Sequence, residues 1–200
     1  MNDENAWVLQ AQRGDDEAFT QLVETYQKPV YNLCYRMLGE PEVAEDAAQE
    51  TFLRAYQNLQ RYDNSRSFGT WILSIAAHYC IDRLRKRKFS VFSLDIEDED
   101  GMPFELPDPA SPDPEVESTK REDRDHLHLL LKDLDDTDRA AVIMRYWYDY
   151  SEVEIAQSLN LTVSAVKRRL HRSRRELAEQ WQKEKPRAYS ERRSRESLAF

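Results

Sequence analysis

The apolar residues of this 200-residue chain recur at three- and four-residue spacing almost everywhere outside residues 91 to 119. That spacing places side chains on one face of a helix. Strand-like alternation is scarce, and the chain contains only four glycines. The pattern therefore predicts an all-α fold.

The segment from 150 to 177 has the pattern of two short helices joined by a tight turn. Ile155, Ala156 and Leu159 form an apolar stripe on the first helix. Asn160 can adopt the left-handed conformation that a turn needs, and Thr162 is a natural N-cap for the next helix. The apolar residues of the second helix are Val163, Val166 and Leu170. A helix propped in this way by a preceding helix is typical of proteins that enter the major groove of DNA.

The second of these helices carries cations without nearby acids. Its basic residues before Glu176 are Lys167, Arg168, Arg169, Arg172, Arg174 and Arg175. Surface helices usually mix both signs, so a solvated basic helix is the weaker interpretation. Self-repulsion of this size is tolerated more readily when a polyanion neutralises it, which favours a nucleic-acid partner.

The formal net charge of −9 hides a segregation of sign along the chain. Residues 1 to 90 carry −2, residues 91 to 119 carry −10, residues 120 to 160 carry −4 and residues 161 to 200 carry +7. A second basic cluster closes the first of these segments: Arg83, Arg85, Lys86, Arg87 and Lys88. Two separated cationic regions suggest a ligand that is contacted at two places.

Residues 91 to 119 contain five prolines and ten acids, with no Lys or Arg. Such a segment can neither continue a helix nor bury much surface, so it predicts an acidic, Pro-rich linker between two small helical domains at 1–90 and 120–182. The linker is either a spacer or an acidic strand that mimics nucleic acid in a basic channel of a partner. The tail, 183–200, is predicted to be disordered, with a regulatory or DNA-contacting arm as the alternative.

The first domain combines an apolar face with an acidic one. Val43, Ala47, Phe52, Ala55, Tyr56 and Leu59 are predicted to face inward, whereas Glu45, Asp46, Gln49 and Glu50 are available to another protein. A polar loop at 62–67 then leads into a helix with these apolar residues: Trp71, Ile72, Ile75, Ala76, Tyr79 and Leu84. Aromatic and polar groups beside positive charge suit an unstacked base.

Several classes of function are disfavoured by the sequence. Cys34 and Cys80 are the only cysteines and are expected to be buried free thiols. No metal motif, nucleophile elbow or phosphate-binding glycine loop is present, so we expect no enzyme, cofactor or metal site. The polar N-terminus and the lack of a long apolar run predict a cytoplasmic protein without membrane insertion.

Three segments in this order resemble RNA polymerase sigma factors of the extracytoplasmic function (ECF, group 4) type in the sigma-70 family. They are AEDAAQETFLRAY, FGTWILSIAAHYCIDRLRKRK and DYSEVEIAQSLNLTVSAVKRRLHRSRREL. The resemblance covers roughly residues 10 to 180. It departs from the family pattern at the turn, where Asn160 replaces a common glycine and Leu161-Thr162 replaces a frequent valine-proline pair.

The resemblance implies that the first domain is sigma domain 2, which binds the clamp of the β′ subunit of core RNA polymerase. The residues on or near the contacting helix are Asp46, Gln49, Glu50 and Phe52. The same domain would melt the −10 element and read it as a single strand. The residues implied in this role are Asn64, Ser65, Arg66, Phe68, Arg83, Arg85, Arg87 and Lys88, with Trp71 in support.

The second domain would be sigma domain 4, which reads the double-stranded −35 element and binds the β flap. Its implied DNA contacts are Ser164, Lys167, Arg168, His171 and Arg172. The resemblance further implies promoter-specific initiation, a stress or envelope-response regulon and an anti-sigma factor as a partner. Two other classes stay open: a one-component transcription regulator, which would need a ligand-binding or dimerising first domain, and, less favoured, an enzyme.

Overall fold

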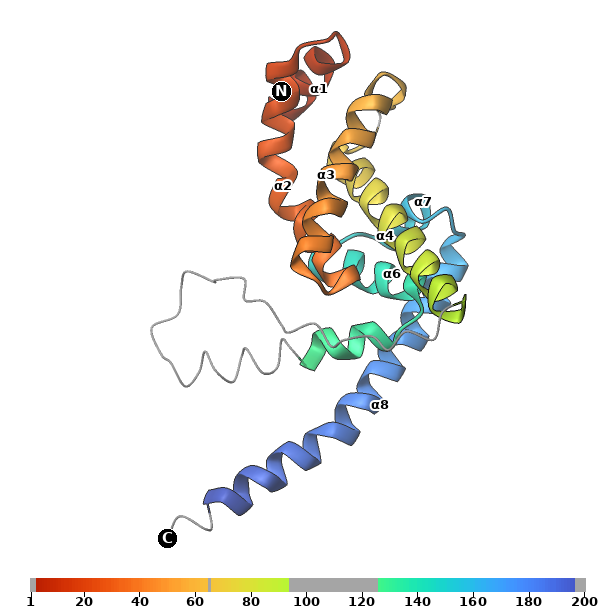
Figure 1. Cartoon of the computed structure of the whole chain (residues 1–200). Coiled ribbons are helices and arrows are strands. Elements are labelled where there is room, and N and C mark those ends of the chain that lie inside the picture. The colour runs from red at the N-terminus through yellow and green to blue at the C-terminus, as the bar shows by residue number, and fades with distance from the viewer. Residues whose placement is uncertain (1–2, 65, 94–125, 197–200) are drawn as a thin grey trace.

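The computed structural model describes residues 3–64, 66–93 and 126–196, and the regular elements in these ranges are all helical (Figure 1). This confirms the all-α prediction. The elements are Asp3–Gln12 (α1), Asp16–Leu38 (α2), Pro41–Asn58 (α3), the 3-10 turn Leu59–Arg61 (η1), Phe68–Ser93 (α4), a helical segment at 126–133, Asp136–Trp147 (α6), Glu152–Ser158 (α7) and Val163–Glu196 (α8). The predicted linker, 91–119, lies largely outside the described residues.

Local signals fix the ends of the N-terminal helices. The Asp15 carboxylate accepts hydrogen bonds from the backbone N–H groups of Glu17 and Ala18, which caps α2. Gly39 ends α2 at a φ of 86°, in the left-handed region that glycine adopts at little cost. Pro41 then occupies the first turn of α3, where its missing N–H leaves no helical hydrogen bond unmade.

Helices α1 to α4, which we call the N-terminal unit, enclose an aromatic cluster beneath the loop at 62–67. Phe68 is only 1% exposed. Its ring centroid lies 5.4 Å from that of Tyr26, 5.7 Å from that of Tyr62 and 5.6 Å from that of Trp71. These edge-on and tilted contacts anchor the start of α4, and with it the loop, to the core.

The 126–133 segment and helices α6 to α8, which we call the C-terminal unit, contain the predicted helix-turn-helix. A capping box between Ser151 and Glu154 starts α7. Asn160 has a φ of 53°, and the Thr162 hydroxyl accepts a hydrogen bond of 3.2 Å from the N–H of Ala165. Both predictions for the turn are therefore confirmed.

Helix α8 is longer than the sequence indicated. The expected disordered tail began at 183, but the helical backbone continues to Glu196 and passes through Pro186. Apart from that proline, the segment is rich in Arg, Glu and Lys, which are all good helix formers. The regular backbone thus extends into the segment for which the sequence indicated disorder, and the disorder of the tail stays a prediction.

The two units pack against each other. Arg139 of α6 is 5% exposed and donates one hydrogen bond of 2.6 Å to the Met37 carbonyl and another of 2.6 Å to the Lys132 carbonyl. The Tyr148 hydroxyl donates a hydrogen bond of 2.6 Å to the carbonyl of Pro29, inside α2. The bonds to Met37 and Pro29 join the C-terminal unit to α2, and buried residues of both units form one continuous core.

Aromatic contacts extend this interface. The Arg36 guanidinium lies 5.2 Å from the centre of the Trp147 ring, and the Tyr35 ring stacks on that of His128 with 5.3 Å between centroids. A Cβ added at Gly39 would lie 2.8 Å from Lys132 Cε, so the end of the Lys132 side chain packs closely against the backbone at Gly39.

We predict that the free energy of unfolding falls in acid, because His128 lies in this interface. Burial, followed by the nearby cations Lys132, Arg139 and Arg36, lowers the pKa of His128 from 6.5 to about 4. An unfolded chain would bind the proton at the usual pKa, so the unfolded state holds more protons between these values and stability falls as the pH falls. We expect a loss of up to about 1 kcal/mol per pH unit in this window.

Urea unfolding at pH 7 and pH 5 measures this loss, with His128→Gln as the comparison because glutamine does not titrate. The wild-type chain should lose more stability between the two pH values than the variant does. Equal losses in both chains would contradict the assignment to His128.

Both cysteines are buried and unbridged, as expected. The hydrogen bond with Cys34, together with burial, raises the pKa of the Cys80 thiol well above its usual value. Within the described residues, no cluster of three His, Cys, Asp or Glu side chains is arranged to bind a metal ion. The helices described here also include none with the length and apolar character to cross a bilayer.

Candidate nucleic-acid interface

The first half of α8 presents the basic face that the sequence predicted. Ser164, Lys167, Arg168 and His171 are all exposed, whereas Val166 is fully buried against the preceding helices. Lys167 lies 3.5 Å from the Glu152 carboxylate at the start of α7. The exposed groups share one side of the helix, which leaves them accessible to a duplex.

Arg172 has a different environment from these four residues. Its guanidinium forms an ion pair and hydrogen bond with Asp138 of α6, although 58% of its side chain is exposed. The hydrogen bond and charge of Asp138 raise the pKa of Arg172. Arg172 therefore serves first to hold α8 against α6, and any DNA contact by this residue competes with that role.

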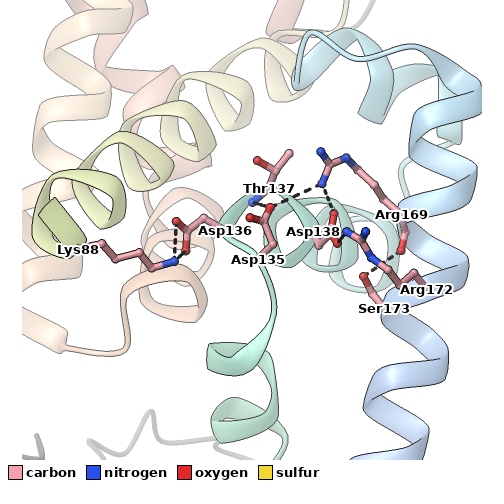
Figure 2. A network of polar contacts seen from close by, with 8 residues as sticks. All are labelled: Lys88, Asp135, Asp136, Thr137, Asp138, Arg169, Arg172 and Ser173. Atoms are coloured by element: carbon pink, nitrogen blue, oxygen red, sulfur yellow. Dashed lines mark hydrogen bonds and ion pairs between the residues drawn. The ribbon is translucent and has the colours of Figure 1, made fainter. Parts of the chain in front are cut away.

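Figure 2 shows the acidic first turn of α6 that receives these cations. Asp138 is 2% exposed and also accepts a hydrogen bond of 2.5 Å from Arg169, which in turn lies 3.6 Å from the Asp135 carboxylate. Asp135 is the N-cap of α6. Negative charge at this position interacts favourably with the helix dipole, so the turn is a stable acidic anchor for α8.

The loop before α4 contains the residues that the resemblance assigns to the −10 element. Asn64 donates a hydrogen bond of 2.9 Å to the Gln12 side chain, and Arg66 is exposed. Ser65 lies outside the described residues. Phe68, which the resemblance places among the contact residues, is buried in the aromatic cluster and supports the loop from below.

A groove beside this loop runs between the end of α3 and the first half of α4. It has a volume of about 410 Å³ and is lined by Arg54, Asn58, Arg61, Trp71, Ser74, Ile75 and His78. Arg54 and Asn58 of α3 and Arg61 of η1 recur at four- and three-residue spacing, and this spacing is the sequence signal that could have indicated a shared face. Cations, amide groups and a partly exposed indole are suited to phosphate and to an unstacked base.

The basic cluster at the end of α4 is partly neutralised. Arg83 lies 4.0 Å from the Asp46 carboxylate, and Arg87 donates a hydrogen bond of 2.6 Å to Glu40. The ammonium group of Lys88 lies 2.9 Å from the carboxylate of Asp136 in the C-terminal unit. The side chains of Arg85 and Lys86 are exposed. Carboxylates therefore neutralise part of the positive charge at this end of α4, and the remaining charge is exposed to a nucleic acid.

Helix α3, which lines one side of the groove, also carries the acidic face that the sequence predicted. Asp46 and Gln49 are exposed, Glu50 pairs with Arg54 at 2.7 Å and Phe52 is half-buried. Tyr56 was expected to face inward, but it is 50% exposed.

Two apolar side chains adjoin that acidic face. Tyr56 packs edge-on against Phe19 with 5.0 Å between ring centroids and donates a hydrogen bond to Asp16. Leu53, one helical turn beyond Gln49 and Glu50, is 51% exposed. Exposed apolar groups next to carboxylates are typical of a protein docking surface.

Comparisons with known proteins match both units. Residues 22–90 match the family model "Sigma-70 region 2", and residues 124–177 match "Sigma-70, region 4". The ECF RNA polymerase sigma factor SigW of Bacillus subtilis is 36% identical over 177 residues, covering 86% of this chain and 94% of that protein. The RNA polymerase sigma-H factor of Pseudomonas aeruginosa is 31% identical, covering 84% of this chain and 88% of that protein.

Two solved structures share the fold. CnrH in complex with the cytosolic domain of CnrY superposes with a TM-score of 0.65 at 24% identity, covering 90% of this chain and 98% of that one. The sigma factor RpoE in complex with the anti-sigma factor NepR from Bartonella quintana has a TM-score of 0.65 at 19% identity, covering 80% and 94% of the two chains.

Proposed function

The chain belongs to the ECF sigma factors of the sigma-70 family, and from this premise we propose a division of labour between its two units. As a sigma factor it directs promoter-specific transcription with RNA polymerase. The N-terminal unit, within 1–90, grips the polymerase and captures the single-stranded −10 element. The C-terminal unit, within 120–182, reads the −35 duplex.

The exposed basic face of α8 is the observation that best supports −35 reading. Arg168 and Lys167 can each reach base edges in a major groove, where one good bidentate contact discriminates by about 1 to 3 kcal/mol. Ser164 and His171 flank them on the exposed side of α8. The cations farther along the helix supply attraction to phosphates, which carries no sequence information.

The groove between α3 and α4 supports capture of the −10 strand. A flipped base costs a few kcal/mol, which stacking and hydrogen bonds in a shaped pocket must offset. Trp71 offers a stacking surface, Arg54 and Arg61 offer positive charge, and Asn58 offers an amide. The loop residues Asn64, Ser65 and Arg66 adjoin this groove in sequence, while Arg83, Arg85, Arg87 and Lys88 extend the positive charge along α4.

Docking to polymerase is assigned to the acidic face of α3. Asp46, Gln49 and Glu50 supply polar and charged contacts for the β′ clamp, and the exposed Leu53 supplies an apolar one. The C-terminal unit would contact the β flap. We propose further that the chain is a group 4 factor of a stress or envelope-response regulon and acts in the cytoplasm. By analogy with the RpoE–NepR complex, we also propose that an anti-sigma factor controls it.

Transcription in vitro with bacterial core polymerase tests the proposed function. The chain should bind promoters weakly alone and should give transcripts with defined starts only together with the core enzyme. Sequencing the 5′ ends would then identify the promoter. A chain that footprints its site unaided and gives no specific starts with core polymerase would instead be a one-component regulator.

Replacing Arg61 tests the groove. The Arg61→Ala variant should bind a fluorescein-labelled single-stranded −10 oligonucleotide several-fold more weakly in complex with core polymerase, because a phosphate contact is lost. Arg13→Ala removes an exposed cation at the end of α1 and is the matched control. Equal anisotropy titrations for the two variants would exclude Arg61 from the path of the strand.

A further inference from the structure

The last residue of α1, Gln12, holds the segment that leads into α4. Its side-chain NH2 group donates hydrogen bonds of 2.9 Å to the carbonyl of Leu59 and 3.0 Å to the carbonyl of Tyr62. Its side-chain oxygen accepts a bond of 2.9 Å from the amide of Asn64. One partly buried side chain thus binds three positions of a segment that lies 47 to 52 residues away along the chain.

A further hydrogen bond between the same segments runs in the opposite direction. The side chain of Gln60 donates it to the backbone carbonyl of Gln12, over a distance of 3.0 Å. The last carbonyls of a helix have no partner within that helix, so this bond satisfies one of them. The end of α1 and the η1 turn therefore hold each other through both side chains and backbone.

The chemistry of these partners determines which way each amide faces. Backbone carbonyls accept hydrogen bonds and never donate them, so the end of Gln12 that meets Leu59 and Tyr62 is its NH2 group. The oxygen of Gln12 then faces Asn64, which must present its own NH2 group in return. The orientation of the Asn64 amide is therefore set by a residue of α1.

An oriented amide distinguishes bases better than one that rotates freely. Rotation exchanges the donor and acceptor ends of an asparagine, so an unrestrained side chain satisfies amino and keto groups alike. Asn64 is exposed, and its bond to Gln12 turns its oxygen away from α1. That acceptor suits the exocyclic amino group of cytosine or adenine and does not suit O4 of thymine.

The same contacts support the wall of the groove. The ring centroid of Tyr62 lies 4.7 Å from that of Trp71, which lines the groove. The Tyr62 hydroxyl also donates a hydrogen bond to the carbonyl of Arg66. Since Gln12 holds the Tyr62 carbonyl, it fixes the backbone that carries both Asn64 and the support of the stacking surface.

We propose that Gln12 is a positioning residue for the −10 element, which orients the Asn64 amide so that its oxygen accepts a hydrogen bond from the amino group of an unstacked base. The inference rests on the proposed function, because it concerns how the single strand is read. Gln12 acts through Asn64 and makes no phosphate contact in this role. Its loss should therefore lower discrimination between bases and leave the general attraction to DNA unchanged.

Two replacements of Gln12 remove its bonds to the backbone, and a neighbouring residue provides the control. Gln12→Met keeps the length of the side chain and a good helix former but loses the bonds to Leu59, Tyr62 and Asn64. Gln12→Glu keeps an oxygen for Asn64 and loses the donors to the two carbonyls. Gln10→Met makes the first of these changes at an exposed position of α1.

The measurement is an anisotropy titration of the holoenzyme with a fluorescein-labelled single-stranded −10 oligonucleotide of the mapped promoter, and with its single-base variants. Ratios of dissociation constants are compared, because a uniform change in affinity cancels in them. Gln12→Met and Gln12→Glu should each lose about three- to tenfold of the discrimination at one position, the range expected for one hydrogen bond. Gln10→Met should keep it. The base preferred at that position should be cytosine or adenine rather than thymine.

Two further readouts separate positioning from a phosphate contact. The affinity of Gln12→Met for a scrambled oligonucleotide of the same length should equal that of Gln10→Met. The salt dependence of binding should also be the same in both variants, since no counterion-releasing contact is lost.

A double-mutant cycle with Asn64→Ala tests whether Gln12 acts through Asn64. Replacing Gln12 in the Asn64→Ala chain should then cause no further loss of discrimination. A further loss of the same size, or unchanged discrimination in the Gln12 variants, would overturn the inference. Circular dichroism should show that all variants are folded. Unfolding of both Gln12 variants would also overturn the inference, because the residue would then serve the fold rather than the reading of bases.

The wild-type holoenzyme distinguishes this failure from that of the proposed function. If only the role of Gln12 is wrong, the wild-type chain still discriminates between the oligonucleotides and Asn64→Ala still weakens that discrimination. A wild-type holoenzyme that binds the intact and altered oligonucleotides alike would instead contradict the proposed capture of the −10 strand.

Discussion

Replacing Asp46 and Glu50 together with lysine is expected to abolish binding to core polymerase while the helices remain intact. The two reversals place positive charge where the proposed docking surface presents carboxylates, and a like-charge contact in an interface costs several kcal/mol. We expect the dissociation constant to rise by a factor of roughly 100 or more. Co-purification of polymerase subunits with a tagged chain, followed by a quantitative titration, measures this effect.

The charge change itself needs a control, because it shifts the net charge of the chain by four. Glu24→Lys with Asp82→Lys makes the same change at exposed positions of α2 and α4 that lie outside the proposed docking surface. This pair should bind the core enzyme within a fewfold of wild type. Normal recovery of polymerase by the Asp46 and Glu50 variant, with wild-type helicity, would move the docking surface elsewhere on the chain.

The Arg168→Ala variant should lose most of the discrimination at the −35 element. Arg168 is exposed on α8, whereas its neighbour Lys167 lies within 3.5 Å of Glu152. One bidentate contact accounts for about 1 to 3 kcal/mol, so promoter affinity should fall by a factor of roughly 5 to 150. Lys167→Ala should have a smaller effect, because part of its charge is already satisfied within the protein.

Footprinting of the holoenzyme on a mapped promoter, and on the same promoter with a scrambled −35 element, measures this loss. Arg175→Ala is the matched control, since Arg175 is exposed farther along α8 and pairs with Glu179 at 3.5 Å. The control should weaken both promoters alike. Unchanged preference for the intact element in Arg168→Ala would show that another part of the chain reads it.

Much of the fold was predictable because its determinants are local. The helix-turn-helix depends on an apolar stripe, a residue tolerant of positive φ and a hydroxyl cap, and all three lie within a dozen consecutive positions. Asn160 and Thr162 adopt the conformations expected of them. Such features follow from backbone sterics and hydrogen bonding between neighbours in sequence.

The residues whose burial the sequence did not indicate are those whose position depends on distant parts of the chain. Phe68 adjoins a polar loop in sequence, and only the packing of Tyr26 and Trp71 around it places it in the core. Tyr56 follows the apolar stripe of α3, yet the hydroxyl bond to Asp16 keeps it at the surface. Helical periodicity alone cannot separate these cases.

The contact between the two units was beyond prediction for a related reason. Lys88 and Asp136 are 48 residues apart, and each is one of many charged residues in its segment. A sequence pattern gives no means of choosing one pair among them. Arg172 illustrates the same limit, since its pairing with Asp138 distinguishes it from the other cations of α8 only once the helices are packed.

The pairing of Arg169 and Arg172 with one buried carboxylate fixes the rotation of α8 about its own long axis. These residues are three positions apart, and because successive residues turn by about 100°, their side chains leave the helix about 60° from each other, on the same side. Fixing these two directions also fixes that of Arg168, which is exposed and leaves the helix about 40° from Arg172 and about 100° from Arg169 (Figure 2 shows the two arginines converging on Asp138). Asp138 thereby determines the direction in which Arg168 points, and with it the proposed reading of bases, although Asp138 itself is only 2% exposed.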